Sequence, residues 1–124
     1  MAEASGGLAA VVEDKALEVY ARFEARLRTK LRALISDELI AEHKAKPLGQ
    51  HSDALERVLN YFRRAPVAGK YVIIAVRPHQ EYAIGVLTGV RGLTPRILDE
   101  QRFNSEEEAE HGVFRQRVRD LMAG

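Results

Sequence analysis

Apolar residues recur every three or four positions along the first third of the chain, with charged residues between them. This spacing places them on one face and predicts a single long amphipathic helix over residues 8–45, ending before Pro47. At about 1.5 Å per residue such a helix approaches 50 Å in length, more than a small domain is wide. The face consists of Val12, Val19, Tyr20, Phe23, Leu27, Leu31, Leu34, Ile35 and Leu39. Part of it therefore needs a partner to cover it.

Two further helices are predicted from capping signals followed by apolar residues at helical spacing. Asp53 and Glu56 form a candidate N-terminal capping pair for a helix over residues 53–64. Ser105 and Glu108 have the spacing of a capping box, and acidic residues fill the first turn that follows. The final helix has an apolar face made of Val113, Phe114, Val118 and Leu121.

Between these helices the pattern changes to that of β-strands. Residues 70–77 and 82–88 are rich in β-branched side chains and flank a turn at Pro78, which predicts an antiparallel hairpin. Residues 96–98 are a candidate third strand. Because helices and strands are segregated along the chain, the predicted class is α+β, with a small antiparallel hairpin or meander between helices.

The whole chain, residues 1–124, is expected to form a single domain. Residues 1–7 are expected to be disordered, residues 8–45 to be the long helix, and residues 51–124 to be a helix, hairpin and helix body. A length of 124 residues, 46% hydrophobic and 30% charged, fits one soluble globular domain.

Composition removes several function classes. The chain has no cysteine, which excludes disulfides, thiolate metal sites and cysteine nucleophiles. Its longest apolar run, residues 71–76, is far shorter than a membrane-spanning helix. The first residues lack the pattern of a secretory signal, so a cytoplasmic location is expected.

No arrangement of residues predicts a catalytic or metal site in this chain. Glu108 and His111 have the Glu-x-x-His spacing of di-iron bundles, but that architecture needs a second copy, and none is present. The pair is therefore interpreted as the solvated start of a helix, where glutamates interact favourably with the helix dipole. His43, His51 and His79 are interpreted as surface or capping histidines. The catalytic and metal-binding sets are therefore both predicted to be empty.

A basic strip with interleaved rings offers one alternative function. RNA-binding modules combine cationic side chains with stacking aromatics, but a net charge of +1 is far from the usual basic footprint. The solvated face of a domain explains the same charges. The cations are Arg63, Arg64, Lys70, Arg77, Arg91, Arg96 and Arg102, and the rings are Tyr61, Phe62 and Tyr71. A free-standing module that binds nucleic acid or another protein thus remains open.

Three blocks resemble the small (alpha) subunit of N,N-dimethylformamidase. They are residues 52–63, which end Arg-Val-Leu-Asn-Tyr-Phe-Arg, then Gly-Lys-Tyr at 69–71, and the most specific, Arg-Phe-Asn-Ser-Glu-Glu-Glu-Ala-Glu-His-Gly-Val-Phe at 102–114. The resemblance extends from about residue 10 to the C-terminus. The hairpin over residues 73–90 is more aliphatic than is typical of that subunit, which leaves a different amide substrate open.

The resemblance implies a complex that hydrolyses N-substituted formamides to formate and an amine. In that family the large subunit carries a mononuclear iron held by tyrosine and glutamate side chains, and the small subunit supplies no ligand. This chain would then be a non-catalytic accessory subunit in a hetero-oligomer, with no cofactor of its own. Contact with a large catalytic subunit is expected, and contact with a membrane is not.

Eight residues are predicted to contact the partner, and each could instead fill the chain's own core. Four come from the long helix, whose apolar face exceeds what a small sheet covers. The other four are anchor-type residues in the resembling blocks. The set is Phe23, Leu27, Leu31, Leu34, Tyr61, Arg63, Phe103 and Phe114.

Overall fold

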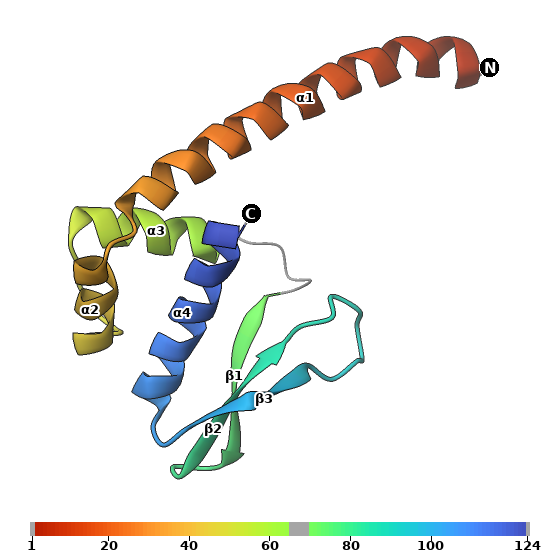
Figure 1. Ribbon diagram of the computed structural model, residues 1–124. Helices are drawn as coiled ribbons and strands as arrows, with labels where there is room; N and C mark the ends of the chain where they lie inside the picture. Colours follow the sequence, from red (N-terminus) through yellow and green to blue (C-terminus); the bar gives the residue numbers. More distant parts are fainter. Residues whose placement is uncertain (1, 65–69, 124) are drawn as a thin grey trace. The chain divides into compact units, whose positions relative to one another are not determined.

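The computed structural model describes residues 2–64 and 70–123, and side chains for residues 15–64, 70–98 and 101–123 of these (Figure 1). Its elements, in chain order, are α1 (Ala2–Leu34), α2 (Asp37–Ala45), α3 (Asp53–Arg63), β1 (Tyr71–Arg77), β2 (Glu81–Val86), β3 (Arg96–Phe103) and α4 (Glu106–Ala123). The predicted α+β class is confirmed. The chain divides by its internal contacts into two compact units, Met1–Ala33 and Leu34–Gly124, and the single domain stays a prediction.

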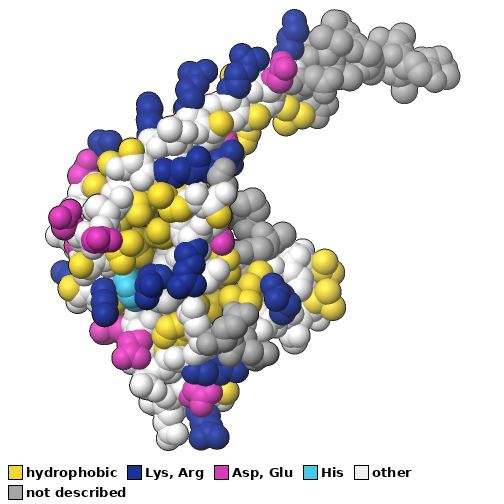
Figure 2. Space-filling view, viewed as in Figure 1, with side chains coloured by type: hydrophobic (Ala, Val, Ile, Leu, Met, Phe, Trp, Pro, Cys, Tyr) yellow, Lys and Arg dark blue, Asp and Glu magenta, His cyan; other side chains and the backbone are white. Residues whose placement is uncertain are grey.

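The first unit consists of α1. This helix begins at Ala2, inside the segment that was expected to be disordered. Figure 2 shows hydrophobic side chains along one side of α1 and Lys and Arg side chains along the other. Leu17, Val19, Tyr20 and Phe23 are all more than half exposed. None of the described helices combines the length and the hydropathy that a membrane-spanning helix needs.

The prediction of one continuous helix over residues 8–45 is wrong, because the helix is interrupted after Leu34. Ser36 has an extended backbone (φ −144°, ψ 165°) and its side chain accepts a hydrogen bond of 3.1 Å from the Leu39 amide. Serine hydroxyls compete for backbone groups in this way and favour helix starts over helix interiors. The apolar spacing continues across the break, which is why periodicity alone did not reveal it.

A serine also begins α3. The Ser52 hydroxyl accepts a hydrogen bond from the Leu55 amide at 3.3 Å, so the N-cap lies one residue before the predicted Asp53. The Ser52 amide and hydroxyl both donate to the Glu42 carboxylate at 2.7 Å. These two bonds tie the loop between α2 and α3 to α2, and they lower the pKa of Glu42.

The strands form an antiparallel meander in the order β1-β2-β3, as predicted. Tyr71 pairs with Val86 at one end of the hairpin and Arg77 with Glu81 at the other. The turn holds His79 in the left-handed region (φ 66°). β3 extends to Phe103, five residues beyond the predicted end, and pairs there with Tyr82.

Helix α4 organises the core of the second unit, because it contacts all three strands and α2. Its start is the predicted capping box: the Ser105 hydroxyl accepts from the Glu108 amide and the Glu108 carboxylate from the Asn104 amide, both at 3.1 Å. Beyond this start one side of α4 is buried. The core of the second unit comprises Leu39, Leu55, Val58, Phe62, Ala83, Ile84, Ala109, Val113, Phe114, Val118 and Leu121.

The end of β3 meets α4 at a glycine. A Cβ atom built on Gly112 would collide with the ring of Phe103, so the ring packs directly on the helix backbone. Gly112 is itself buried. Glycine weakens an isolated helix by about 1 kcal/mol relative to alanine. At position 112 it is nevertheless required, because a larger residue would not leave room for the Phe103 ring.

Replacing Gly112 with alanine should destabilise the chain. Overpacking costs about 1–3 kcal/mol and the helix gains about 1 kcal/mol, so we expect a net loss of up to about 2 kcal/mol in the free energy of unfolding. Urea denaturation of the G112A variant measures it. The double variant G112A/F103L should recover most of the loss, and a G112A chain more stable than the wild type would contradict this packing.

Candidate functional site

Two histidines meet inside the second unit. His43 of α2 and His111 of α4 are 3% and 9% exposed, and their Nδ1 atoms lie 2.9 Å apart. Such a bond needs one nitrogen that carries its proton and one that does not. At least one of the two rings is therefore a neutral imidazole.

The surroundings keep both rings neutral. Burial, and then the neighbouring His111 and His51, lower the pKa of His43 to about 4, and Glu42 opposes this only in part. Burial also lowers the pKa of His111, with further contributions from Arg115 and Lys44. Near pH 7 the pair thus acts as a hydrogen-bonded structural link between α2 and α4.

This pair corrects two sequence interpretations. His43 was assigned to the surface or to a cap, yet it lies four residues after the buried Leu39 and continues the apolar face of α2. The spacing was visible in the sequence, but histidine was counted as polar. The region of Glu108 and His111 was interpreted as a solvated helix start, which holds for the capping Glu108 and fails for the buried His111.

His51 supports the same corner of the structure. Its Nε2 atom donates to the carbonyl oxygen of Lys46 at 2.5 Å, and its ring stacks at 6.0 Å from that of His43. Among the residues whose side chains are described, no three of the types histidine, cysteine, aspartate and glutamate are grouped so as to hold a metal ion.

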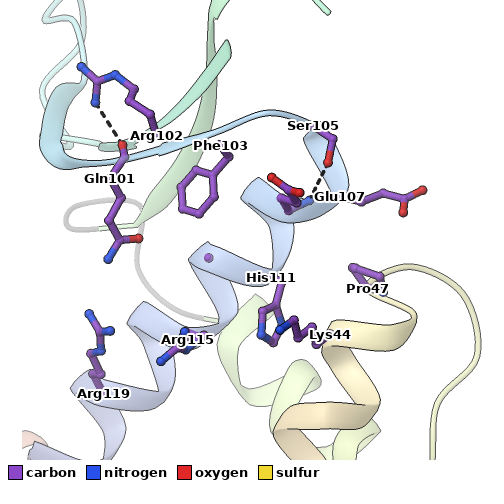
Figure 3. A pocket seen from close by; sticks show the side chains of 12 residues that line it. Lys44, Pro47, Gln101, Arg102, Phe103, Ser105, Glu107, His111, Arg115 and Arg119 are labelled. Atoms are coloured by element: carbon purple, nitrogen blue, oxygen red, sulfur yellow. Dashed lines mark hydrogen bonds between the residues drawn. The ribbon is translucent and has the colours of Figure 1, made fainter. Parts of the chain in front are cut away.

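A pocket of about 710 Å³ opens beside the histidine pair (Figure 3). It is lined by residues from the end of α2 and the loop after it, from the end of β3, and from α4. His111 and Gly112 belong to its wall, so the pocket adjoins the contacts that hold α4 in place. The other lining residues are Lys44, Pro47, Gln101, Arg102, Phe103, Ser105, Glu107, Glu108, Arg115 and Arg119.

The four predicted partner contacts on α1 differ in exposure. Phe23 is 58% exposed, whereas Leu27 and Leu34 are half-buried. Leu31 is 3% exposed and offers little surface. Phe23 and its neighbours Tyr20 and Val19 therefore carry the exposed apolar face of this helix.

The four predicted partner contacts in the second unit also differ in exposure. Phe114 is 2% exposed and is a core residue. Tyr61 is half-buried and tilted against the ring of Phe62 at 6.1 Å. Arg63 is exposed and donates to Asn60 at 2.9 Å, and Phe103 packs on the helix at Gly112. Contact of these residues with a partner stays a prediction, and for Phe114 no exposed side-chain surface supports it.

The basic strip considered for nucleic acid has two of its three rings occupied within the chain. Phe62 is 5% exposed and lies in the core. The Tyr71 hydroxyl donates to the Asp120 carboxylate, and burial raises the pKa of Tyr71. Since two of the three rings are used within the chain, the exposed arginines around them do not form the platform that single-stranded nucleic acid requires.

Comparison with known proteins identifies relatives over most of the chain. Residues 18–124 match the profile of a family described as N,N-dimethylformamidase alpha subunit. The N,N-dimethylformamidase alpha subunit of Alcaligenes sp is 38% identical over 115 residues, which cover 89% of this chain and 86% of the relative. That of Paracoccus aminophilus is 35% identical over 113 residues, covering 87% and 79%.

The buried histidine pair predicts acid sensitivity. An unfolded histidine takes up a proton near pH 6.5 and His43 only near pH 4, so stability is complete above pH 6.5 and falls as the pH is lowered between these values. We expect His43 to contribute a loss of about 2 kcal/mol between pH 7.5 and pH 5. Urea denaturation at the two pH values measures it.

The matched control is the exposed His79. H43Q should reduce the pH dependence of the free energy of unfolding by more than half, whereas H79Q should leave it as in the wild type. Equal pH dependence in all three chains would mean that His43 is not held neutral by the fold.

Proposed function

The chain belongs to the N,N-dimethylformamidase alpha subunit family, and we propose that it acts as the small accessory subunit of a hydrolase built from two kinds of chain. In the proposed complex, a large partner subunit contains the reaction centre, where an N-substituted formamide and water yield formate and an amine. This chain stabilises the folded and assembled state of that partner.

The main observation in support of this proposal is the exposed apolar face of α1. Tyr20, Phe23 and Leu27 follow one another at the spacing of a single helical face, inside the region shared with the family. Tyr20 and Phe23 are 62% and 58% exposed. Contiguous apolar surface of this kind is typical of interaction sites, and aromatic residues dominate the binding energy of many interfaces.

The proposal assigns a mononuclear iron to the partner subunit, with no ligand from this chain. Bound there, the metal would supply Lewis-acid polarisation of the amide carbonyl. The roles of the histidines in this chain support the assignment of the metal ligands to the partner subunit. His43 and His111 bond to each other in the core, and His51 bonds to the Lys46 carbonyl, so these rings serve the fold.

The direct test is to purify this chain and its large partner separately and together. We expect neither chain alone to hydrolyse N,N-dimethylformamide, the mixture to release formate and dimethylamine, and metal analysis to find iron in the large chain. A panel of other linear amides addresses the aliphatic hairpin at residues 73–90. Activity of this chain alone, or a large chain that is active and stable without it, would refute the accessory role.

An aspartate in place of Phe23 should weaken the complex selectively. Because this side chain is exposed, F23D should change the free energy of unfolding of the isolated chain by less than about 0.5 kcal/mol. Loss of an aromatic contact and burial of a charge should raise the dissociation constant of the complex at least about tenfold. Analytical ultracentrifugation of the mixed chains measures this constant.

Ala25 provides the matched control. It is exposed and lies about 200° around the helix from Phe23, so A25D adds the same charge on the opposite side of α1. A25D should bind as the wild type does. If F23D and A25D weaken binding equally, the apolar face of α1 is not the contact.

A further inference from the structure

The pocket beside the histidine pair is predominantly basic. Its charged lining consists of four cations and two carboxylates, all from the second unit: Lys44, Arg102, Arg115 and Arg119 against Glu107 and Glu108. The overall charge of the chain is only +1, so this is a local concentration of positive charge. The question is which of these charges are already neutralised within the chain.

The carboxylates of the lining do not neutralise the cations on α4. Glu108 accepts a hydrogen bond from the Asn104 amide at the start of the helix. Figure 3 shows Glu107 pointing away from Arg115 and Arg119. Arg102 has its own partner outside the pocket lining, the Glu81 carboxylate at 3.2 Å. Three cations are left: Lys44, Arg115 and Arg119.

These three cations have no anionic partner among the described residues. Lys44 and Arg115 make no hydrogen bond or ion pair there, and Arg119 donates only to the neutral amide of Gln116, at 3.5 Å. Arg115 and Arg119 are four residues apart, on the same side of α4, where like charges destabilise a helix. The chain thus holds mutually repelling charges that an external anion would relieve.

The fold fixes where these charges stand. The bond between His43 and His111 holds the end of α2 against α4, and Lys44 is the next residue after His43. Burial lowers the pKa of His111 most, and the nearby charges of Arg115 and Lys44 lower it further. The charges therefore converge on one wall of the pocket from two helices.

We infer that this basic pocket receives an acidic segment, bearing Asp or Glu side chains, of the large partner subunit. The inference rests on the proposed function and names the chemistry of a second contact besides the apolar face of α1. Arginine is enriched in protein interfaces because its planar guanidinium pairs with carboxylates through two hydrogen bonds.

The shape of the pocket favours a protein segment over a free ion. Its volume of about 710 Å³ is far larger than a single small ion needs. Pockets for small anions are commonly built on backbone amides at a helix start. Here Ser105 and Glu108 occupy that position on α4, so recognition falls to long, exposed side chains.

Charge reversal in the assembled complex tests the inference. R115E and the double variant K44E/R115E should raise the dissociation constant of the complex by about tenfold or more, and R115Q by less. Binding by the wild type should weaken as NaCl rises from about 50 to 300 mM, and that salt dependence should be reduced in R115Q. R91E, at an exposed loop position outside the pocket, is the control with the same charge change and should bind as the wild type does.

Circular dichroism melts of each free variant establish that it folds. If the folded R115E and R91E chains bind the large subunit equally well, the inference is overturned. Titration of sulfate or an oligonucleotide, followed by NMR of the His111 ring, tests the other occupants. If either one saturates the pocket while the R115E chain still binds the large subunit normally, the inference is also overturned. Failure of the wild-type chain to bind any large subunit would instead refute the proposed function itself.

Discussion

The packing around Phe114 holds the second unit together. Its ring stacks on His43 of α2 at 4.0 Å with an angle of 10° between the planes, and meets Phe62 of α3 edge-on at 6.0 Å. His111 precedes Phe114 by three residues on α4 and bonds to the edge of the same His43 ring. One turn of α4 therefore contacts both the face and the edge of the His43 ring. Together with the contact between Phe114 and Phe62, this packs α2 and α3 against α4.

A histidine in this position links the fold to the charge on the surface. A leucine would fill the same space, but it would not need a polar partner on α4 or respond to nearby charge. Because His43 is turned inward, Lys44 points to another side of α2, 100° away, and lines the pocket. Its charge and that of Arg115 then oppose protonation of His111. An anion bound in the pocket would offset these two positive charges. Occupancy of the pocket and protonation of the His111 ring are therefore coupled.

The local elements could be predicted from the sequence, and the contacts between distant elements could not. Capping residues and alternating patterns identified α3, the hairpin and α4, since these signals act within a few residues. The break at Ser36 was missed because the apolar spacing on both sides stays in phase. The meeting of His43 with His111, 68 residues apart, depends on how α2 packs against α4, and no local pattern encodes it. Residue chemistry alone names no partner, and the expectation of a large partner subunit came from the resemblance of residues 52–63, 69–71 and 102–114 to the family.

The character of α1 suggests why such a subunit would need its partner. A helix in water gains most of its stability from packing an amphipathic face and little from intrinsic propensity. The side-chain pairs along the described surface of α1 include Glu18 with Arg22 at 3.7 Å and Tyr20 with Glu24 at 3.3 Å, and each such pair contributes only about 0.2–0.5 kcal/mol. The exposed rings of Tyr20 and Phe23 represent a far larger reserve of apolar surface. Covering them would release the free energy that α1 does not obtain from its own surface pairs, so binding of the partner and stability of this helix are expected to rise together.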